Sequence, residues 1–578
     1  MDIHQLNFSF LKKSMNSEAP IHRQIKVAIL ADSSTQLIVQ ALIGYGRMLG
    51  TRYTVFEPAP DQLDQQVFDL SSELYRFSPG IVLILLSTQK QQQDFYRLRA
   101  DRRIDFADER SSYIDTLVKT LGQQLSVPVI IGNLPEIDDG VFGHYAGKTA
   151  SSFLYQLRKL NYLLMEKASA NPGVFICDLA ALTAKMGFNN SFDPKMRTYA
   201  DMAFHIDFLP WLVKAWHDII QAINGQINKC LILDLDNTTW GGIIGDDGLE
   251  GIQVGTLGLG KIFTGIQLWV KQLAQRGIIV VICSKNEEET ARSPFLHHPE
   301  MELRMEDIAL FVANWENKVD NIRYIQQVLN IGFDTMVFLD DDPVERARIQ
   351  QTIPEITVPD LPKDPAEWLS WLQDLDLFET AYLTPEDGAR TAAYQKAIER
   401  TRLQKTFINE SDFLASLEMR SEVKAIDAFT LPRAVQLSQR SNQFNLRTIR
   451  YTESDLQDIT ADPRYLTLSF TLEDKYGDYG LIALVVGHRQ EDALWIDNWI
   501  MSCRVLKRGM ENFVFECLCQ AAANAGYKSL IGEFLPTKKN DLVKDHYERL
   551  EFSNVGGNRW ARDLTDISSS TQNLIKRK

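Results

Sequence analysis

The sequence has 578 residues, of which 45% are hydrophobic and 24% are charged, with a formal net charge of −15. At roughly 100 to 200 residues per domain, this length predicts three or four domains. The composition excludes a disordered, collagen-like or coiled-coil chain, and the negative charge argues against a broad basic surface for nucleic acid or anionic membranes. We therefore expect small molecules or proteins as partners.

Location and redox state follow from two further features. No apolar run approaches the roughly 18 residues of a membrane helix, and the first residues lack the basic and apolar blocks of a signal peptide. These features predict a cytoplasmic protein. The six cysteines are scattered, without a C-x-x-C pair, which predicts reduced thiols and no structural zinc site. They are Cys177, Cys230, Cys283, Cys503, Cys517 and Cys519.

Short, uniformly apolar runs alternate with helix-length stretches through the first 225 residues. Strands that helices cover on both faces have this uniform apolarity, so the pattern predicts a doubly wound α/β domain over residues 1–225. The expected strands are 27–30, 81–85, 129–131 and 174–176.

The same pattern predicts a second α/β domain over residues 226–365, with strands at 230–233, 278–282 and 336–339. Prolines mark its end, and residues 366–421 have the charged helical character of a connector. From 422 to 578 the pattern changes to antiparallel strands followed by a long helix, which predicts an α+β domain. Its expected elements are strands 465–471, 480–488 and 493–501 and helix 508–525.

Polar side chains follow the strands of the second domain where open α/β sheets place their sites. Asp234 and Asp236 follow the first strand. Two acids two residues apart can hold Mg²⁺ and act on phosphate, although a D-x-D segment can also be an Asx-rich turn. Ser284 could donate to a phosphate oxygen, and Lys318 could neutralise phosphoryl charge. The acids at 340–342 follow the last strand and can complete a metal's oxygen shell.

This order of residues resembles the haloacid dehalogenase-like (HAD) phosphotransferase superfamily, with D-x-D-x-T, then Ser or Thr, then Lys, then an acidic pair. The resemblance implies that Asp234 is the nucleophile, which forms an aspartyl-phosphate, and that Asp236 is general acid and then base. It implies that Thr238, Ser284 and Lys318 bind the phosphoryl oxygens. The implied Mg²⁺ ligands are Asp234, Asp236, Asp340 and Asp341, with the choice between the last two left open.

Longer segments resemble the FkbH-like subgroup of this superfamily. They are residues 234–248, 282–286, 338–346, 439–446 and 502–506. The resemblance implies a glyceryl transferase/phosphatase that takes a three-carbon unit from 1,3-bisphosphoglycerate and loads it onto an acyl carrier protein for polyketide-type biosynthesis. The implied partners are a carrier protein with its phosphopantetheine arm and a phosphorylated three-carbon substrate.

Residues 504–509 (Arg-Val-Leu-Lys-Arg-Gly) resemble the R-x-x-G-x-G/A loop with which GNAT-type acetyltransferases hold coenzyme A. Lys507 stands at the first glycine of that loop, and a side chain there hinders close approach to a pyrophosphate, which argues against conventional acetyl transfer from coenzyme A. Arg504, Arg508 and Gly509 are then a candidate groove for a pantetheine arm.

Cys503 lies between an apolar strand and Arg504, where basic neighbours favour a thiolate. The FkbH-like resemblance implies that this thiolate attacks the acyl phosphate and carries the glyceryl unit as a thioester, whereas a cysteine at a strand end is in general a small buried hydrophobe. Cys283, beside Ser284, is the competing thiol, and its apolar strand favours a structural role.

The first domain resembles SGNH-type esterases at residues 32–34 (Asp-Ser-Ser), with Asn133 in the place of their oxyanion-hole asparagine. Two departures weaken the resemblance: an alanine replaces the glycine before Asp32, and Asp201 and His205 are four residues apart rather than three. We interpret this part as a docking domain with a serine-rich helix cap at 33–35 and a structural histidine. A Ser-His-Asp hydrolase is the alternative.

The overall expectation is a multidomain α/β enzyme: an SGNH/flavodoxin-like doubly wound domain, a HAD-like Rossmannoid domain and a GNAT-like α+β domain. Two other functions are alternatives. One is a coenzyme A-dependent acyltransferase with an attached HAD phosphatase domain, against which Lys507 counts. The other is a non-enzymatic scaffold for a synthase complex, which would leave all the strand-end acids, Ser284 and Lys318 idle.

Overall fold

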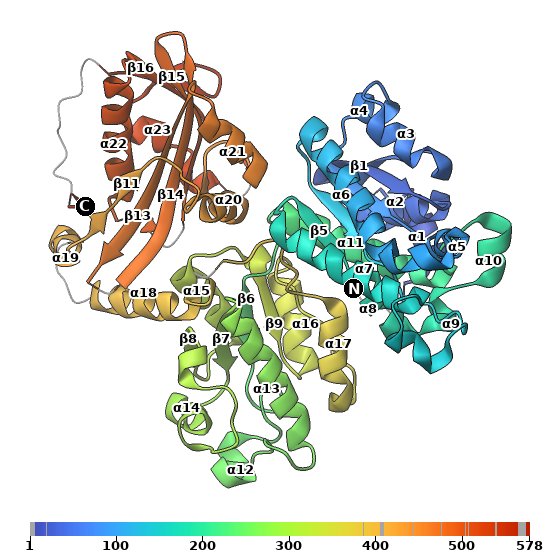
Figure 1. Ribbon diagram of the computed structural model, residues 1–578. Helices are drawn as coiled ribbons and strands as arrows, with labels where there is room; N and C mark the ends of the chain where they lie inside the picture. The colour runs from blue at the N-terminus through green and yellow to red at the C-terminus, as the bar shows by residue number, and fades with distance from the viewer. Residues whose placement is uncertain are drawn as a thin grey trace. The chain divides into compact units, whose positions relative to one another are not determined.

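The computed structural model describes most of the chain: residues 6–18, 20–384, 387–404, 410–441, 443–475, 477–502, 505–506, 508–537, 540–564 and 574–578. The chain divides into two compact units, Met1–Gln221 and Ala222–Lys578. Figure 1 shows their elements. The prediction of an α/β chain with parallel sheets is confirmed.

The first unit is built on a five-stranded parallel sheet of order β2-β1-β3-β4-β5. Helices α6 (Phe106–Leu125) and α7 (Phe153–Ala170) cover one face with an apolar cluster. On the other face, His217 of α11 (Leu209–Ile223) packs edge-on against Tyr45 of α2 (Gln36–Met48). The strands are β1 (Arg23–Ala31), β2 (Thr51–Phe56), β3 (Ile81–Leu85), β4 (Val129–Gly132) and β5 (Val174–Cys177).

The second unit begins with a four-stranded parallel sheet of order β8-β7-β6-β9. Neighbouring side chains of each strand point to opposite faces, so one set packs on α13 (Gly260–Gln275) and the other on α15 (Lys318–Leu329) and α16 (Pro343–Thr352). The strands are β6 (Cys230–Leu233), β7 (Ile279–Ser284), β8 (Leu310–Ala313) and β9 (Met336–Leu339). Their carboxyl ends form one edge, where the candidate site lies.

The predicted connector is helical, and it packs against the sheet that precedes it. Trp368 and Leu372 of α17 (Trp368–Leu375) join the apolar cluster of α13, and Tyr394 of α18 (Arg390–Gln404) joins the cluster on the opposite face of the sheet. A short helix, α19 (Glu410–Ser416), follows. The boundaries at 365/366 and 421/422 stay predictions.

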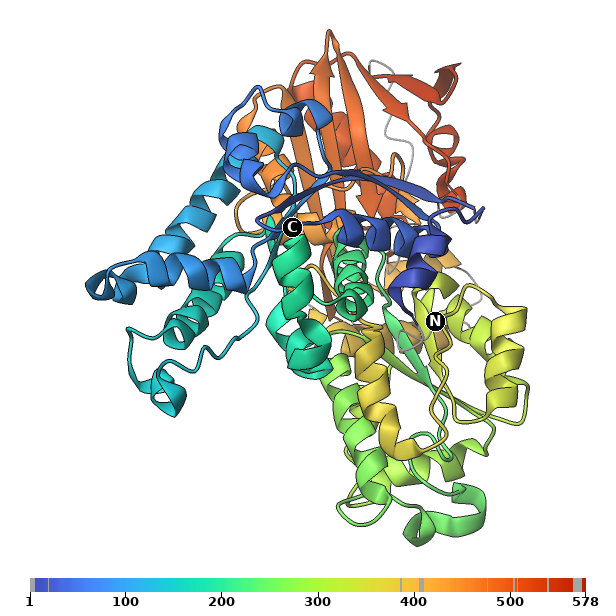
Figure 2. The same ribbon diagram turned by 90° about the vertical axis from the view of Figure 1, so that its right-hand side faces the viewer.

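The last part of the chain has the predicted antiparallel strands and long helix. Helix α22 (Met510–Asn524) packs on one face of the sheet and α20 (Leu431–Arg440) on the other. Figure 2 shows the long strands side by side in a twisted sheet. The principal strands are β13 (Tyr465–Asp474), β14 (Gly477–Gln490), β15 (Ala493–Met501), β16 (Ser529–Glu533) and β18 (Arg559–Asp563), of which β15 and β16 run parallel.

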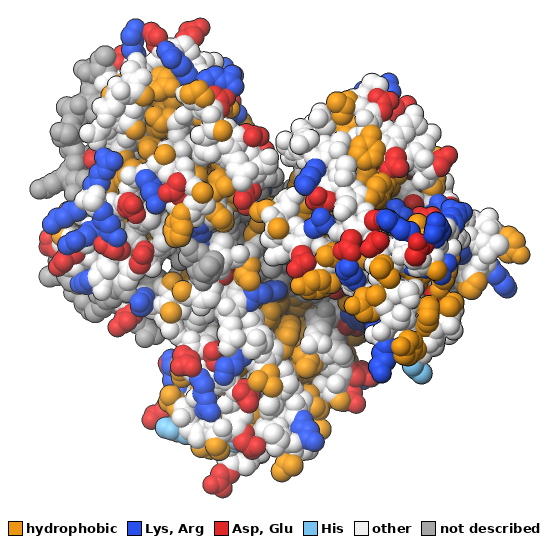
Figure 3. Space-filling view, in the orientation of Figure 1, with side chains coloured by type: hydrophobic (Ala, Val, Ile, Leu, Met, Phe, Trp, Pro, Cys, Tyr) orange, Lys and Arg blue, Asp and Glu red, His pale blue; other side chains and the backbone are white. Residues whose placement is uncertain are grey.

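The exterior carries charges of both signs. On the face in Figure 3, lysine and arginine side chains are interspersed with aspartate and glutamate. Among the described helices, none is both long and apolar enough to cross a membrane.

Candidate functional site

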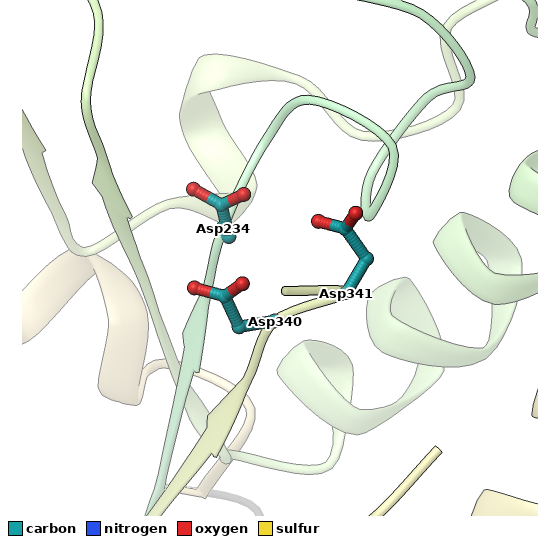
Figure 4. A group of neighbouring side chains, drawn as sticks. All are labelled: Asp234, Asp340 and Asp341. Carbon is teal, nitrogen blue, oxygen red and sulfur yellow. The ribbon is translucent and has the colours of Figure 1, made fainter. Parts of the chain in front are cut away.

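Three carboxylates meet at the carboxyl edge of the second unit's parallel sheet. Asp234 directly follows β6, while Asp340 and Asp341 follow β9, which is the neighbouring strand. Each offers an oxygen, and the three oxygens lie within 4.8 Å of one another. Figure 4 shows the carboxylates of the three residues turned toward one space. The adjacency of β6 and β9, over 100 residues apart in sequence, therefore creates the cluster.

The backbone beside the cluster is held in place on both sides. Asp342 is the N-cap of α16, where its carboxylate accepts a hydrogen bond from the amide of Val344 at 2.8 Å. The guanidinium of Arg346 donates to the carbonyl oxygens of Asp340 and Asp341 at 2.8 and 2.6 Å. The turn after β9 is therefore fixed before any ligand binds, which lowers the cost of assembling the site.

Lys318 joins two of the carboxylates. Its ammonium lies 2.8 Å from Asp234 Oδ1 and 2.5 Å from Asp340 Oδ2, and all three side chains are buried. The lysine is the first residue of α15, whose N-cap is Asn317, with its side-chain oxygen 2.9 Å from the amide of Asp320. The helix start thus aims the ammonium at the point where the carboxylates meet.

The charges of this cluster do not balance. Burial raises the pKa of Asp234 to about 7 against the opposing effect of Lys318, and the neighbouring Asp340 raises it further. Burial also raises the pKa of Asp341. Burial acts to lower the pKa of Lys318, but the carboxylates of Asp234 and Asp340 outweigh burial and raise it. Two buried carboxylates and the half-buried Asp341 beside one ammonium have excess negative charge, and hard oxygen ligands suit a cation such as Mg²⁺. The donor set therefore fits this ion.

We expect Lys318→Met to lower phosphate release about 100-fold, because the ammonium that would neutralise phosphoryl charge is lost. Removing it also leaves buried carboxylates unpaired, so the metal-free protein should lose roughly 3 kcal/mol of stability. Thermal unfolding of the variant and of the unaltered protein, in EDTA and in Mg²⁺, measures this loss. The difference in stability between the two proteins should be smaller in Mg²⁺. Lys285→Met is the matched control, since Lys285 pairs with Glu345 and is partly exposed. Equal effects of the two variants would contradict the assignment.

Asp236 lies outside the three-carboxylate cluster and is held by three donors. Its Oδ1 accepts from the indole of Trp240 at 3.0 Å and from the amide of Ile244 at 2.9 Å, and its Oδ2 accepts from Asn286 at 2.8 Å. This arrangement orients the carboxylate as an acid and base requires. Metal ligation by Asp236 stays a prediction, because among the described residues its side chain is not in the cluster.

Ser284 and Thr238 also lie at this edge. Ser284 ends β7 and contacts Asp234, and its hydroxyl accepts from Asn286 at 3.2 Å. The Thr238 hydroxyl donates to Asp341 Oδ1 at 3.1 Å and accepts from the Asp341 amide at 2.9 Å. The structure thus gives Thr238 a place holding Asp341, while its predicted contact with phosphate stays a prediction.

A pocket of about 640 Å³ opens over these residues. Its lining includes the predicted Asp234, Asp236, Lys318, Asp340 and Asp341. It also includes Asp342, the third of the strand-end acids predicted at 340–342. The residues of the lining to which the sequence assigned no role are Asn237, Ile243, Gly245, Asp246, Lys285, Asn286, Glu287, Thr290, Trp315 and Glu345. Asn286 and Glu345 lie within segments that resemble the FkbH-like subgroup. The sequence therefore indicated these segments but not the side chains that the two residues contact.

Asn286→Ala should lower the kcat of the phosphatase by roughly 10-fold, because the Asn286 side chain positions both Asp236 and Ser284. A small misplacement of a catalytic group slows the reaction. Steady-state kinetics should show the loss in kcat rather than in KM. Glu288→Gln, which alters an exposed residue two positions further along the chain, is the control. A wild-type kcat for Asn286→Ala would show that Asp236 needs no such support.

The candidate pantetheine groove is described only in part. Cys503, Arg504 and Lys507 lie outside the described residues. Arg508 is buried, with its guanidinium 3.5 Å from Asp474 and over the ring of Tyr479. Gly509, which precedes α22, has a φ of +77°, and glycine adopts this backbone conformation without strain. The structure therefore anchors Arg508 beside the start of α22.

Asp201 and His205, the candidate acid and base of a Ser-His-Asp triad, have other partners among the described residues. Asp201 pairs with Arg197 at 2.7 Å, and His205 Nδ1 accepts from the amide of Asp207 at 3.1 Å. Asn133 donates to Asp178 at 2.8 Å and accepts from the amide of Ala180.

The helix cap predicted at 33–35 is confirmed in its position but has no side-chain capping bond. Thr35 is the N-cap of α2, but its hydroxyl donates to Glu57 at 2.7 Å and makes no capping bond. A long-range partner therefore outcompetes the local backbone.

Comparisons with known proteins add the family. The N-terminal domain family of FkbH matches residues 26–221. A crystal structure of the N-terminal part of the protein BF1531 from Bacteroides fragilis, which contains a phosphatase domain and is complexed with Mg, is 46% identical in sequence, with a TM-score of 0.62. The match covers 65% of this chain and 100% of that one. The chain belongs to the same family as this phosphatase-domain relative, with an FkbH N-terminal domain at residues 26–221.

Other comparisons say less about this FkbH-like chain. The ribosomal-protein-S18-alanine N-acetyltransferase from Escherichia coli matches with 17% identity over 26% of this chain and 98% of that one, at a TM-score of 0.20. No conclusion about acyl transfer follows from so low a score. The search of curated proteins found no match.

Proposed function

We propose that this FkbH-like chain is a Mg²⁺-dependent HAD-type phosphatase coupled to glyceryl transfer. In this proposal it takes a glyceryl unit from 1,3-bisphosphoglycerate, removes phosphate and loads the unit as a thioester on an acyl carrier protein for polyketide-type biosynthesis. The observation that carries the phosphatase part is that Asp234, Asp340, Asp341 and Lys318 cluster in the lining of one pocket. The Mg-bound relative with a phosphatase domain supports it.

The residues divide the phosphatase chemistry between two steps. An Asp234 oxygen attacks phosphorus, the bond from phosphorus to the substrate oxygen breaks, and Asp236 gives a proton to the leaving oxygen. Asp236 then takes a proton from water as the water attacks phosphorus, which frees phosphate and restores Asp234. Ser284 and Lys318 hold the phosphoryl oxygens. Asp234, Asp340 and Asp341 would hold Mg²⁺, which when bound offsets the repulsion between carboxylate and phosphate.

The transfer part of the proposal rests on the FkbH-like resemblance and on thiol chemistry. The Cys503 thiolate attacks the carbonyl carbon of the acyl phosphate, and phosphate leaves with the bonding electrons. The thiol of the carrier's pantetheine arm then replaces Cys503 in a thioester exchange. Arg504, Arg508 and Gly509 are the proposed supports of that arm. These roles lead to a test with both proteins present.

The test is to incubate the chain with Mg²⁺, 1,3-bisphosphoglycerate and a phosphopantetheinylated carrier protein, and then to weigh both proteins intact. The proposal predicts a carrier that gains one glyceryl unit without its phosphate. With EDTA, phosphate removal should stop, and added Mg²⁺ should restore it. A carrier that stays unloaded in Mg²⁺, with no phosphate release from any phosphomonoester, would refute the proposed function.

A further inference from the structure

Two apolar side chains stand out in the pocket because both are exposed to solvent. Trp315 is 77% exposed and Ile243 is 43% exposed, and both line the pocket. Apart from glycine, every other described lining residue is polar or charged. When a ligand buries the face of an exposed tryptophan, the binding free energy becomes more favourable by kilocalories per mole rather than by tenths of a kilocalorie per mole. An apolar surface beside a phosphate site therefore suits the organic part of a substrate.

The loop that carries Trp315 is braced rather than loose. Asn314 accepts from the Glu316 amide at 3.0 Å, and Asn314 and Asn321 exchange side-chain hydrogen bonds at 3.1 and 2.8 Å. Trp315 lies three residues before Lys318 in this loop. The backbone that carries the ring is therefore held close in sequence to the phosphate-binding ammonium, as a positioning surface requires.

The charges around the pocket restrict what the organic part can be. Eight carboxylates line it, against two lysines. Both lysines already have partners: Lys285 lies 2.8 Å from Glu345, and Lys318 contacts Asp234 and Asp340. Among the described lining residues, no further cation is present, and the lining stays negative even with one divalent cation bound. A second anionic group on the substrate would therefore be repelled.

We propose that Trp315 and Ile243 bind the organic part of the phosphate substrate and that this part is uncharged. The substrate class is a phosphomonoester of a neutral, partly apolar body, such as a phosphorylated acyl thioester, rather than a molecule with a second phosphate or a free carboxylate. The pocket volume of about 640 Å³ leaves room for more than a three-carbon unit. The inference rests on the proposed phosphatase function and names the substrate class of that site.

The charge part is tested with 3-phosphoglycerate and its methyl ester, which carry the same phosphate and differ by one carboxylate charge. In Mg²⁺, kcat/KM for the ester should exceed that for the acid by about 10-fold or more, since like charges in a shielded pocket repel strongly. A variant with Asp246→Asn, Glu287→Gln and Asp342→Asn should narrow this ratio. Equal kcat/KM values for the two compounds would overturn the charge part.

The apolar part is tested with phenyl phosphate and glycerol 3-phosphate. Trp315→Ala should lower the ratio of their kcat/KM values by about 10-fold, because aromatic contact and burial are lost for phenyl phosphate. Because Trp315 is exposed, its replacement removes little packing, and the thermal unfolding midpoint of the variant checks that the fold is kept. Tyr324→Ala, which alters an aromatic side chain 45% exposed on α15 and outside the pocket lining, should keep the wild-type ratio.

The outcomes separate this inference from the proposed function. If the wild-type chain hydrolyses none of the four compounds in Mg²⁺, the proposed phosphatase function fails. If it hydrolyses them and Trp315→Ala leaves the ratio at its wild-type value, the phosphatase stands and the role of Trp315 is refuted. A 10-fold change with Trp315→Ala and none with Tyr324→Ala supports the inference.

Discussion

Asp234→Asn should lower phosphate release by a factor on the order of 10³ or more, because the amide keeps the shape of the side chain but is not a nucleophile. The effect should appear with small phosphomonoesters as well as with the full substrate, since the same oxygen attacks phosphorus in both. A phosphate-release assay in Mg²⁺ measures it.

The fold of this variant must be checked separately, because Asp234 is buried against Lys318. Replacing one carboxylate of the cluster leaves Lys318 its contact with Asp340, so circular dichroism should show an intact fold. Asp246→Asn, at an exposed position of the same pocket, is the charge-matched control and should keep most of the activity toward small phosphomonoesters. Phosphate release near the wild-type rate by Asp234→Asn would remove Asp234 as the nucleophile.

Cys503→Ala should abolish loading of the carrier protein while phosphate release from a simple phosphomonoester persists. A thiolate suits the transfer because acyl phosphate has a good leaving group, and because a thioester exchanges readily with the carrier's thiol. An oxygen ester, as Cys503→Ser would form, should stall at that point. Intact-mass spectrometry of both proteins after substrate addition measures acylation of the chain and of the carrier.

Cys283→Ala is the control for this experiment. Cys283 lies next to Ser284 but is fully buried within β7, and burial raises the pKa of its thiol to about 12, which disfavours the reactive thiolate. We expect this variant to load the carrier. If Cys503→Ala also loads the carrier at the normal rate, the Cys503 thiol is structural, and direct transfer from acyl phosphate to the pantetheine thiol becomes the better mechanism.

The strands were predictable where their burial is uniform. The predicted runs within β1, β3, β4, β6, β7 and β9 are apolar, because helices cover both faces of their sheets. The first half of β1, where burial alternates, was not predicted. The edge strand β2 was missed because Thr51 to Phe56 alternates between buried and exposed positions. In the parallel sheet of the second unit, the edge strand β8 was also missed, although Leu310 to Ala313 is uniformly buried.

The strand-end acids were predictable because a parallel sheet gathers the carboxyl ends of its strands at one edge. The order of the strands was not, and it is the adjacency of β6 and β9 that brings Asp234 next to Asp340. Contacts between side chains were also beyond the sequence pattern. The three donors around Asp236 and the exposed face of Trp315 appear only when strand ends and loops meet.

The phosphorylated intermediate provides the most direct test of the central claim, that Asp234 is the nucleophile of a phosphatase site. Asp236→Asn removes the base that activates water, so the aspartyl-phosphate should accumulate when this variant meets a phosphomonoester in Mg²⁺. Acid quenching, digestion and mass spectrometry locate the modified residue. The account predicts one phosphoryl group on Asp234, absent when Asp234 is also replaced by asparagine. A phosphoryl group on another residue, or an Asp236→Asn variant that turns over at the parental rate with no covalent intermediate, would contradict it.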